Sequence, residues 1–195
     1  MSNIKLLGLS GSLRSGSYNT SVLRNVKSLL PQEIELEIYQ DLGKLPLYSE
    51  DLDGVDLHPE ARRLRNAIAE SDGVLISSPE HNFSLSAALK NALDWSSRPY
   101  GSHPFIGKPT GILGASGGIL GTIRAQLHTR EILHALEADL VTRPEVLITQ
   151  AGLKFDTDGR LVDDSAKALI LQLIDNLTAK IENVRKNLEV ESLAS

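Results

Sequence analysis

Cysteine is absent from the 195-residue sequence, which excludes disulfides, thiolate metal sites and cysteine nucleophiles. Any redox chemistry must therefore come from a bound cofactor. Long apolar runs are also absent, and none approaches the ~18 residues that a membrane-spanning helix needs. Basic residues are not in excess either, because the formal net charge is −5, which argues against binding to nucleic acid or anionic membranes. A small-molecule partner is therefore expected.

The N-terminal segment lacks the charged and apolar regions of a secretory signal, so a cytoplasmic protein is expected. The histidines do not have the spacing of a metal site. His58, His81 and His103 fall in separate predicted loops. His128 and His134 are six residues apart and so lie on different faces of one predicted helix. No metal is predicted.

Short apolar runs divide the chain, at residues 4–9, 34–39, 74–77, 110–115 and 146–149. They are nearly continuous in hydrophobicity, which is typical of parallel strands that helices cover on both faces. Apolar residues at helical spacing occupy the segments that follow them. This alternation predicts a single α/β domain over residues 1–195, with a flavodoxin-like, doubly wound parallel sheet of about five strands in the order 2-1-3-4-5.

The first predicted strand leads into a helix through residues 10–19, a segment rich in hydroxyl groups that also contains Arg14. Unpaired N–H groups at the start of a helix bind anions, and an arginine adds full charge and bidentate geometry. The spacing matches neither the dinucleotide-binding nor the NTPase phosphate loop. The segment predicts a phosphate site, against the simpler interpretation of a helix cap alone; the candidate donors besides Arg14 are Ser10, Ser12, Ser17, Asn19 and Thr20.

Two further loops follow the third and fourth predicted strands, at the sheet edge where doubly wound proteins bind ligands. In the earlier one, Pro79 ends the strand and residues 80–84 form an exposed polar tip before a helix capped by Ser84 or Ser86. The later one, residues 114–124, is rich in glycine, so a planar ring could lie against its backbone. Each loop taken alone could also be an ordinary strand-to-helix turn.

Residues 114–118 match the G-x-S-x-G nucleophile elbow of α/β hydrolases, which makes Ser116 a candidate nucleophile. In those enzymes an acid and then a histidine follow the serine. After Ser116 the sequence has only His128 and His134, both in the next predicted helix and poorly placed to reach back. A serine hydrolase is therefore the disfavoured interpretation.

Three segments, GSLRSGSYN, SPEHNFSLSAALKNALDWSSRP and ASGGILGTIRAQ, occur in this order on these elements. Together they resemble the NADPH-dependent FMN reductase family, which includes bacterial quinone, azo and chromate reductases, over nearly the whole chain. The resemblance implies an FMN cofactor whose phosphate is held by Ser10, Ser12, Arg14, Ser17 and Asn19. It also implies two loops along the isoalloxazine ring, formed by Pro79, Glu80, His81, Asn82, Phe83 and Ser84 on one side and by Ser116, Gly117 and Gly118 on the other. His81 stands where the family usually has tyrosine, so an imidazole replaces a phenol beside the expected ring.

The resemblance further implies an enzyme that transfers hydride from NADPH or NADH through FMN to an acceptor, with no catalytic residue of its own. Quinones, azo compounds, metal oxyanions and free flavin all suit such a site. Donor and acceptor would share one open face of the ring, which predicts ping-pong kinetics. An electron carrier of the flavodoxin type is the alternative, although one Trp, four Tyr and three Phe leave few rings to stack around a flavin.

A homodimer or homotetramer is also implied by the resemblance. The helical segments 85–98 and 120–140 are expected to contribute to the interface between subunits. Arg124 and Glu145 are candidate partners across that interface near the flavin.

Overall fold

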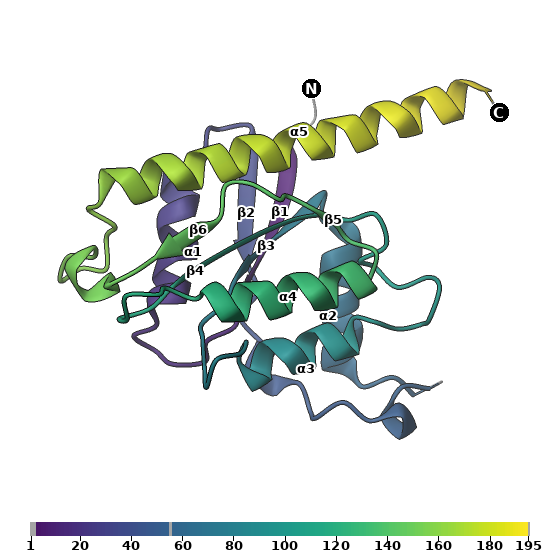
Figure 1. The fold of residues 1–195 in the computed structure, drawn as a ribbon. Coiled ribbons are helices and arrows are strands. Elements are labelled where there is room, and N and C mark those ends of the chain that lie inside the picture. Colours follow the sequence, from purple (N-terminus) through teal and green to yellow (C-terminus); the bar gives the residue numbers. More distant parts are fainter. Residues whose placement is uncertain (1–2, 55, 195) are drawn as a thin grey trace.

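The apolar runs of the sequence form the strands of one parallel sheet in the computed structural model, which describes residues 3–54 and 56–194 (Figure 1). Its strands run in the order β2-β1-β3-β4-β5, and β6 also pairs with β4. The predicted order and the flavodoxin-like α/β fold are therefore confirmed. The strands are β1 (Ile4–Ser10), β2 (Ile34–Ile38), β3 (Gly73–Ser77), β4 (Pro109–Ala115), β5 (Asp139–Leu140) and β6 (Val146–Ile148).

The fifth position of the sheet differs from the expected single strand over residues 146–149. It is shared by β5, which pairs with the beginning of β4, and β6, which pairs with the end of β4. Between them, residues 142–145 leave the ladder. Pro144 lies in this gap and has no N–H group to donate to a neighbouring strand, which accounts for the interruption.

Helices cover both faces of the sheet, as Figure 1 shows. One face packs against α1 (Tyr18–Leu29) and α5 (Asp164–Ala194), the other against α2 (Pro59–Glu70), α3 (Ala87–Trp95) and α4 (Ile123–Ala135). Two apolar clusters result, one on each face, with the central strands contributing to both. Among the described residues, no helix is long and apolar enough to cross a membrane.

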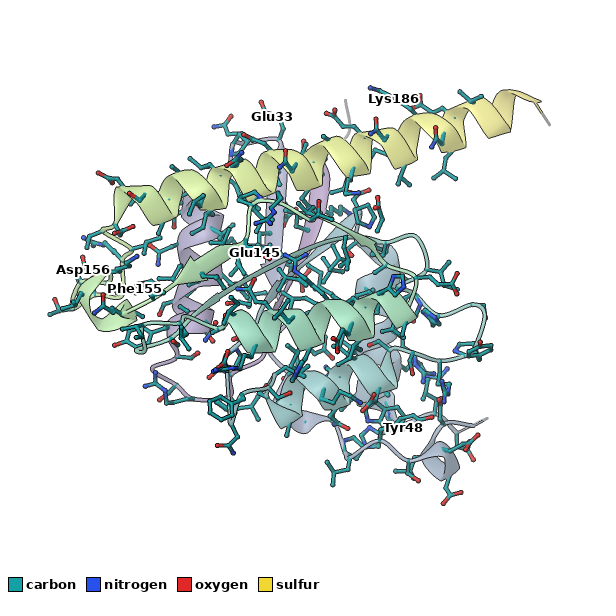
Figure 2. All side chains as sticks on the ribbon, in the orientation of Figure 1. Glu33, Tyr48, Glu145, Phe155, Asp156 and Lys186 are labelled. Carbon is teal, nitrogen blue, oxygen red and sulfur yellow. The ribbon has the colours of Figure 1, made fainter. Side chains whose placement is uncertain are left out.

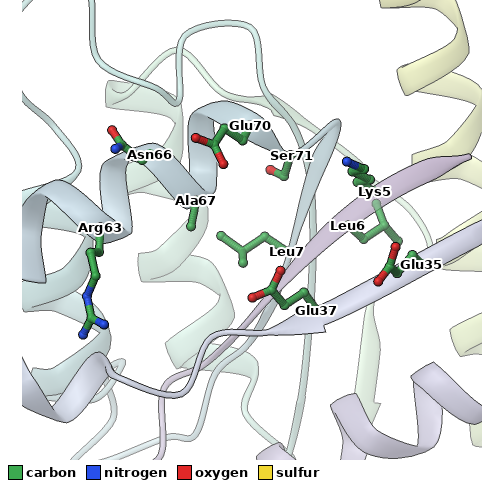
Figure 3. A pocket seen from close by; sticks show the side chains of 10 residues that line it. All are labelled: Lys5, Leu6, Leu7, Glu35, Glu37, Arg63, Asn66, Ala67, Glu70 and Ser71. Carbon is green, nitrogen blue, oxygen red and sulfur yellow. The ribbon is translucent and has the colours of Figure 1, made fainter.

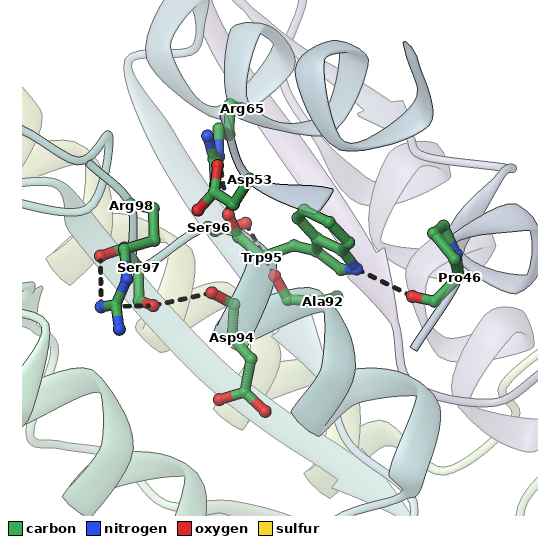
Figure 4. A network of polar contacts seen from close by, with 9 residues as sticks. All are labelled: Pro46, Asp53, Arg65, Ala92, Asp94, Trp95, Ser96, Ser97 and Arg98. Carbon is green, nitrogen blue, oxygen red and sulfur yellow. Dashed lines mark hydrogen bonds and ion pairs between the residues drawn. The ribbon is translucent and has the colours of Figure 1, made fainter. Parts of the chain in front are cut away.

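The long connection from β2 to α2, residues 39–58, is fastened onto α3 and α2 (Figure 4). The indole Nε1 of Trp95 donates to the carbonyl of Pro46 at 2.8 Å. Arg65 donates from Nε to the carbonyl of Trp95 at 2.7 Å and pairs with Asp53 at 2.8 Å, both side chains of that pair being nearly buried. These contacts brace the C-terminal end of α3, whose N-terminal end carries one of the candidate site loops.

Candidate functional site

Asn19 ties together the strand ends at which the candidate loops begin. Its Nδ2 donates to the carbonyl of Ala115 at 3.0 Å, while its Oδ1 accepts from the Ala115 N–H and from the Ser77 hydroxyl, each at 3.0 Å. The side chain is buried, and these three bonds use both acceptor positions of Oδ1 and one of the two Nδ2 hydrogens. Asn19, which was expected to bind the phosphate, therefore links α1, β3 and β4 with its side chain, while its backbone N–H at the start of α1 remains for an anion.

The first loop, residues 10–17, ends at a conventional helix cap. Ser17 is buried, and its Oγ accepts from the N–H of Thr20 at the start of α1. The hydroxyls of Ser10 and Thr20 lie 2.8 Å apart. Arg14 is exposed, and its guanidinium carbon lies 5.8 Å from the ring centroid of Tyr18. Ser17 therefore provides the cap without excluding an anion from the rest of the loop.

A cavity of about 330 Å³ opens beside this loop, lined among others by Ser10, Ser12, Arg14 and Thr20. Sequence reasoning missed two cations on its wall, Arg24 and Lys44. Arg24 stands four residues after Thr20 on α1, so helical periodicity alone would have placed both on one face. Lys44, by contrast, comes from a separate 3₁₀ turn (Leu42–Lys44) and pairs with Asp41 at 2.9 Å.

Tyr39 lines the same cavity and lies half-buried where β2 ends. Burial raises the pKa of its phenol, with the nearby Arg63 charge acting in the opposite direction. The phenol therefore stays protonated at neutral pH, and its hydroxyl donates to the carbonyl of Glu60 at 3.5 Å.

The second loop forms a tight hairpin at its tip. His81 and Ser84 exchange two backbone hydrogen bonds, of 2.8 and 3.0 Å, around Asn82 and Phe83. Both central residues have left-handed backbones, with φ of 50° and 67°. This conformation suits asparagine but is uncommon for phenylalanine, so the turn is held by its surroundings. The predicted exposed tip is therefore a defined turn, and Ser86 rather than Ser84 caps α3.

The third loop is closed by Ser116. Its Oγ donates to the carbonyl of Gly121 at 2.7 Å and accepts from the N–H of Gly118 at 3.2 Å. The nearest candidate base in sequence, His128, instead has its Nδ1 2.9 Å from the hydroxyl of Ser84. Ser116 therefore acts as a turn-forming residue, and this geometry gives the hydrolase interpretation no support.

A cavity of about 610 Å³ lies between the second and third loops, and its lining includes the predicted residues Glu80, Asn82, Phe83, Ser116 and Gly118. The rest of the lining is Ile119, Leu120, Gly121 and Arg124. Of these, only Arg124 is expected near the flavin from the sequence, as a residue of the subunit interface. Ile119 and Leu120 are exposed, which is costly for large apolar side chains unless something covers them. The cavity thus combines apolar rims with one cation, a surface suited to a planar molecule.

Figure 3 shows a different groove, of about 440 Å³, between α2 and the strands β1 and β2. Lys5, Glu35, Glu37, Arg63 and Glu70 line it, with charges of both signs. Lys5 stands near the beginning of β1, so this groove is away from the carboxyl ends of the strands. None of the site residues predicted from the sequence contributes to it. The candidate site is therefore the edge where the three loops meet.

A sequence profile of the family described as NADPH-dependent FMN reductase matches residues 4–152, more than half of the chain. The chain belongs to the NADPH-dependent FMN reductase family. It is similar to the NAD(P)H-dependent FMN reductase of Pseudomonas aeruginosa, with 44% identity over 94% of this chain and 98% of the relative. A 2-hydroxy-1,4-benzoquinone reductase of a Burkholderia species is 37% identical over 93% and 98% of the two chains.

Among solved structures, this chain is similar in fold to a flavoenzyme NAD(P)H:(acceptor) oxidoreductase from Paracoccus denitrificans. The TM-score is 0.84 with 30% identity, covering 92% of this chain and 98% of the other. The family expected from the three sequence segments is thereby confirmed. With it, the expected enzyme class is confirmed as well: an FMN reductase that depends on NAD(P)H.

The third loop of this FMN reductase family member fits a flat cofactor ring. At Gly117 no heavy atom lies within 4 Å of the place that a Cβ would occupy, and its φ lies outside the left-handed region. The packing and backbone of the chain therefore do not themselves require glycine there. The bare backbone is thus open to a flat ligand, and the FMN ring is of this kind.

The positive charges and hydrogen-bond donors of the first loop suit the phosphate of FMN. Arg14 and Arg24 face one cavity that also has the hydroxyls of Ser12 and Thr20 on its wall. Among the residues of 3–54 and 56–194, no group of three or more acidic or histidine side chains is placed to hold a metal ion. The two arginines and the hydroxyl groups of this cavity suit the phosphate of an anionic cofactor.

Proposed function

We propose that this protein, as a single domain over residues 1–195, transfers hydride from NADPH or NADH through FMN to quinones and related acceptors. The observation that carries the proposal is that the three loops begin at strand ends joined by Asn19, with a cationic cavity at the first loop and an open glycine backbone at Gly117 in the third. Relatives of 44% and 37% identity, named as an FMN reductase and a hydroxybenzoquinone reductase, support the reaction type.

The phosphate of FMN would lie on the first loop and the start of α1. Arg14 would supply charge and bidentate donors, and Ser10, Ser12 and Thr20 would supply hydroxyls. Asn19 has its side chain engaged, so it would contribute its backbone N–H. The N–H of Ser17 already donates to the carbonyl of Arg14 at 3.1 Å, and its Oγ accepts from Thr20, so Ser17 would contribute its hydroxyl hydrogen. The ring would lie against residues 79–84 and 116–118, with the hairpin and the glycine backbone along it and one face left open to the reactants.

When bound, FMN supplies a ring that accepts a hydride and passes it on, so the protein needs no nucleophile or general base. The side chains instead position the reactants and limit access of water. Ile119, Leu120 and Phe83 give the cavity apolar surfaces that suit a quinone. Azo compounds, metal oxyanions and free flavin remain acceptors that an open cavity of this size would also admit.

Donor and acceptor would occupy the cavity beside Gly118 and Phe83 in turn, because two planar molecules cannot both stack within the ~3–3.5 Å that hydride transfer requires. Initial rates of NADPH oxidation at several quinone concentrations should therefore give parallel double-reciprocal lines. NADPH alone, without oxygen, should bleach the flavin band of the reconstituted protein in one stoichiometric step. Intersecting lines would contradict the shared cavity, and a flavin that stays oxidised under NADPH would favour the electron-carrier alternative.

We also propose a homodimer or homotetramer that uses residues 85–98 and 120–140. Leu120 and Leu127 are about half exposed, and a groove of about 680 Å³ between α3 and α4 is partly apolar. Within one chain Arg124 pairs with Glu80, and Glu145 with Arg143, so a contact between Arg124 and Glu145 would require these pairs to rearrange. Sedimentation at micromolar concentration tests the assembly, and a purely monomeric species would contradict it.

A further inference from the structure

The helix that follows the third loop is capped by a residue from the second loop. Thr122, the N-cap residue of α4, makes no capping bond, since its Oγ1 accepts from the Nε2 of Gln126 at 3.1 Å. Glu80 takes this role from outside the helix. Its Oε2 accepts from the N–H groups of Arg124 at 3.0 Å and Ala125 at 3.3 Å. A carboxylate there satisfies orphan donors and complements the positive end of the helix dipole.

Glu80, Arg124 and Phe83 form a stack in which each side chain contacts the next, from the nearly buried Glu80 to the exposed Phe83. Its Oε1 lies 3.6 Å from NH1 of Arg124, and the Arg124 guanidinium lies 4.4 Å from the ring centroid of Phe83. The exposed fraction of the side chain is 12% for Glu80 and 43% for Arg124. The stack joins the strained hairpin at Phe83 to the first turn of α4, and that turn continues directly from the third loop.

We propose that Glu80 is a positioning residue that sets the spacing between the two loops bordering the FMN ring. This inference rests on the proposed function, because the ring is assigned to these loops there. Both carboxylate oxygens are directed to α4, one to two N–H groups and the other to a guanidinium. The carboxylate therefore acts on the cofactor through the loops.

The sign of the effect separates positioning from a direct effect of charge. FMN is an anion, so removing a nearby carboxylate should tighten FMN binding if only Coulombic repulsion changed. Loss of a positioning contact should weaken binding, because the loops would no longer hold the geometry that the ring needs. The two explanations thus predict opposite changes in the dissociation constant.

The test is a titration of apoprotein with FMN, followed by quenching of flavin fluorescence, for three substitutions at one position. Glu80→Ala removes the cap and is expected to weaken binding about tenfold, the scale of a lost helix cap. Glu80→Asp keeps the charge but falls one methylene short, and should weaken binding to a similar extent. Glu80→Gln keeps the reach and an acceptor oxygen, and should restore the affinity to within about threefold of wild type.

A second measurement, amide hydrogen exchange of the apoprotein, reports on the cap itself without any cofactor. In Glu80→Ala and Glu80→Asp the N–H groups of Arg124 and Ala125 should exchange about tenfold faster, whereas Glu80→Gln should protect them. Arg14→Ala is the matched binding control: it should weaken FMN binding by about tenfold to a hundredfold without changing exchange in α4. Glu33→Ala removes an exposed carboxylate at the opposite end of the sheet (Figure 2). It should change neither the affinity for FMN nor the amide exchange in α4.

The outcomes are distinct. Tighter or unchanged FMN binding in Glu80→Ala, with wild-type protein binding FMN, would overturn the positioning role and leave the proposed function intact. An Asp variant that binds like wild type while the Gln variant does not would also overturn it, since charge would then matter and reach would not. A wild-type apoprotein that binds no FMN would overturn the proposed function and this inference together.

Discussion

Asn19→Ala is expected to lower the free energy of unfolding by about 3 kcal/mol or more, because three buried polar groups would lose their partner at ~1–3 kcal/mol each. These groups are the Ala115 N–H, the Ala115 carbonyl and the Ser77 hydroxyl. For a chain of this length each kcal/mol corresponds to roughly 2–4 °C, so the melting temperature should fall by roughly 6–12 °C. Thermal and urea unfolding of the apoprotein measure the loss directly.

Asn183→Ala is the matched control, because Asn183 is an exposed asparagine on α5. Its effect should stay within about 0.5 kcal/mol, as for most surface substitutions. Asn19→Asp should also destabilise the protein, since aspartate cannot donate to the Ala115 carbonyl and would place a charge in a buried position. A loss below about 1 kcal/mol in Asn19→Ala would show that Asn19 does not hold the strand ends together.

Gly114→Ala at the end of β4 and Gly117→Ala in the third loop, three residues further on, are expected to have opposite effects. A Cβ at Gly114 would overlap Thr122 Oγ1 and lie 2.5 Å from the carbonyl oxygen of Ser78, which belongs to the backbone and cannot turn away. The overlap should destabilise the fold by about 3 kcal/mol or prevent folding altogether. Yield and urea unfolding of the Gly114→Ala protein measure this effect.

A Cβ at Gly117 would meet nothing within 4 Å, and the backbone there is not left-handed. Gly117→Ala should therefore leave stability unchanged or raise it by about 0.4–1 kcal/mol through the unfolded state. The added methyl would stand in the place assigned to the FMN ring, so the affinity for FMN should fall about tenfold. Normal FMN affinity in Gly117→Ala would mean that the ring does not lie against this backbone.

Much of the fold could be predicted from the sequence because its determinants are local. A buried parallel strand is a run of apolar residues, and a helix start is a hydroxyl before an apolar periodicity, as at Ser17 and Ser86. Segment order and general topology rules then give the sheet order, and the sheet order gives the edge where the loops meet. The interruption between β5 and β6 was missed, although Pro144 in the printed sequence is a local signal for it.

The roles of single side chains could not be predicted, because they depend on partners far away in the sequence. Asn19 in a polar loop has the features of a ligand or a cap, and its actual partners lie 58 and 96 residues further on. Glu80 has the features of an exposed loop residue, yet it caps a helix 44 residues later. Arg14 and Ser12, whose expected role depends only on their own loop, line one cavity, and their contact with the phosphate stays a prediction.

Because the partners of Asn19 lie at positions 77 and 115, its side-chain hydrogen bonds can form only late in the synthesis of the chain. Its side chain has no partner until Ser77 and Ala115 have left the ribosome and β3 and β4 have joined the sheet beside β1. Until then the first turn of α1 lacks its anchor, whatever its own cap contributes. We therefore expect a nascent chain that ends before residue 115 to be unable to capture FMN, so that cofactor uptake reports on a completed sheet.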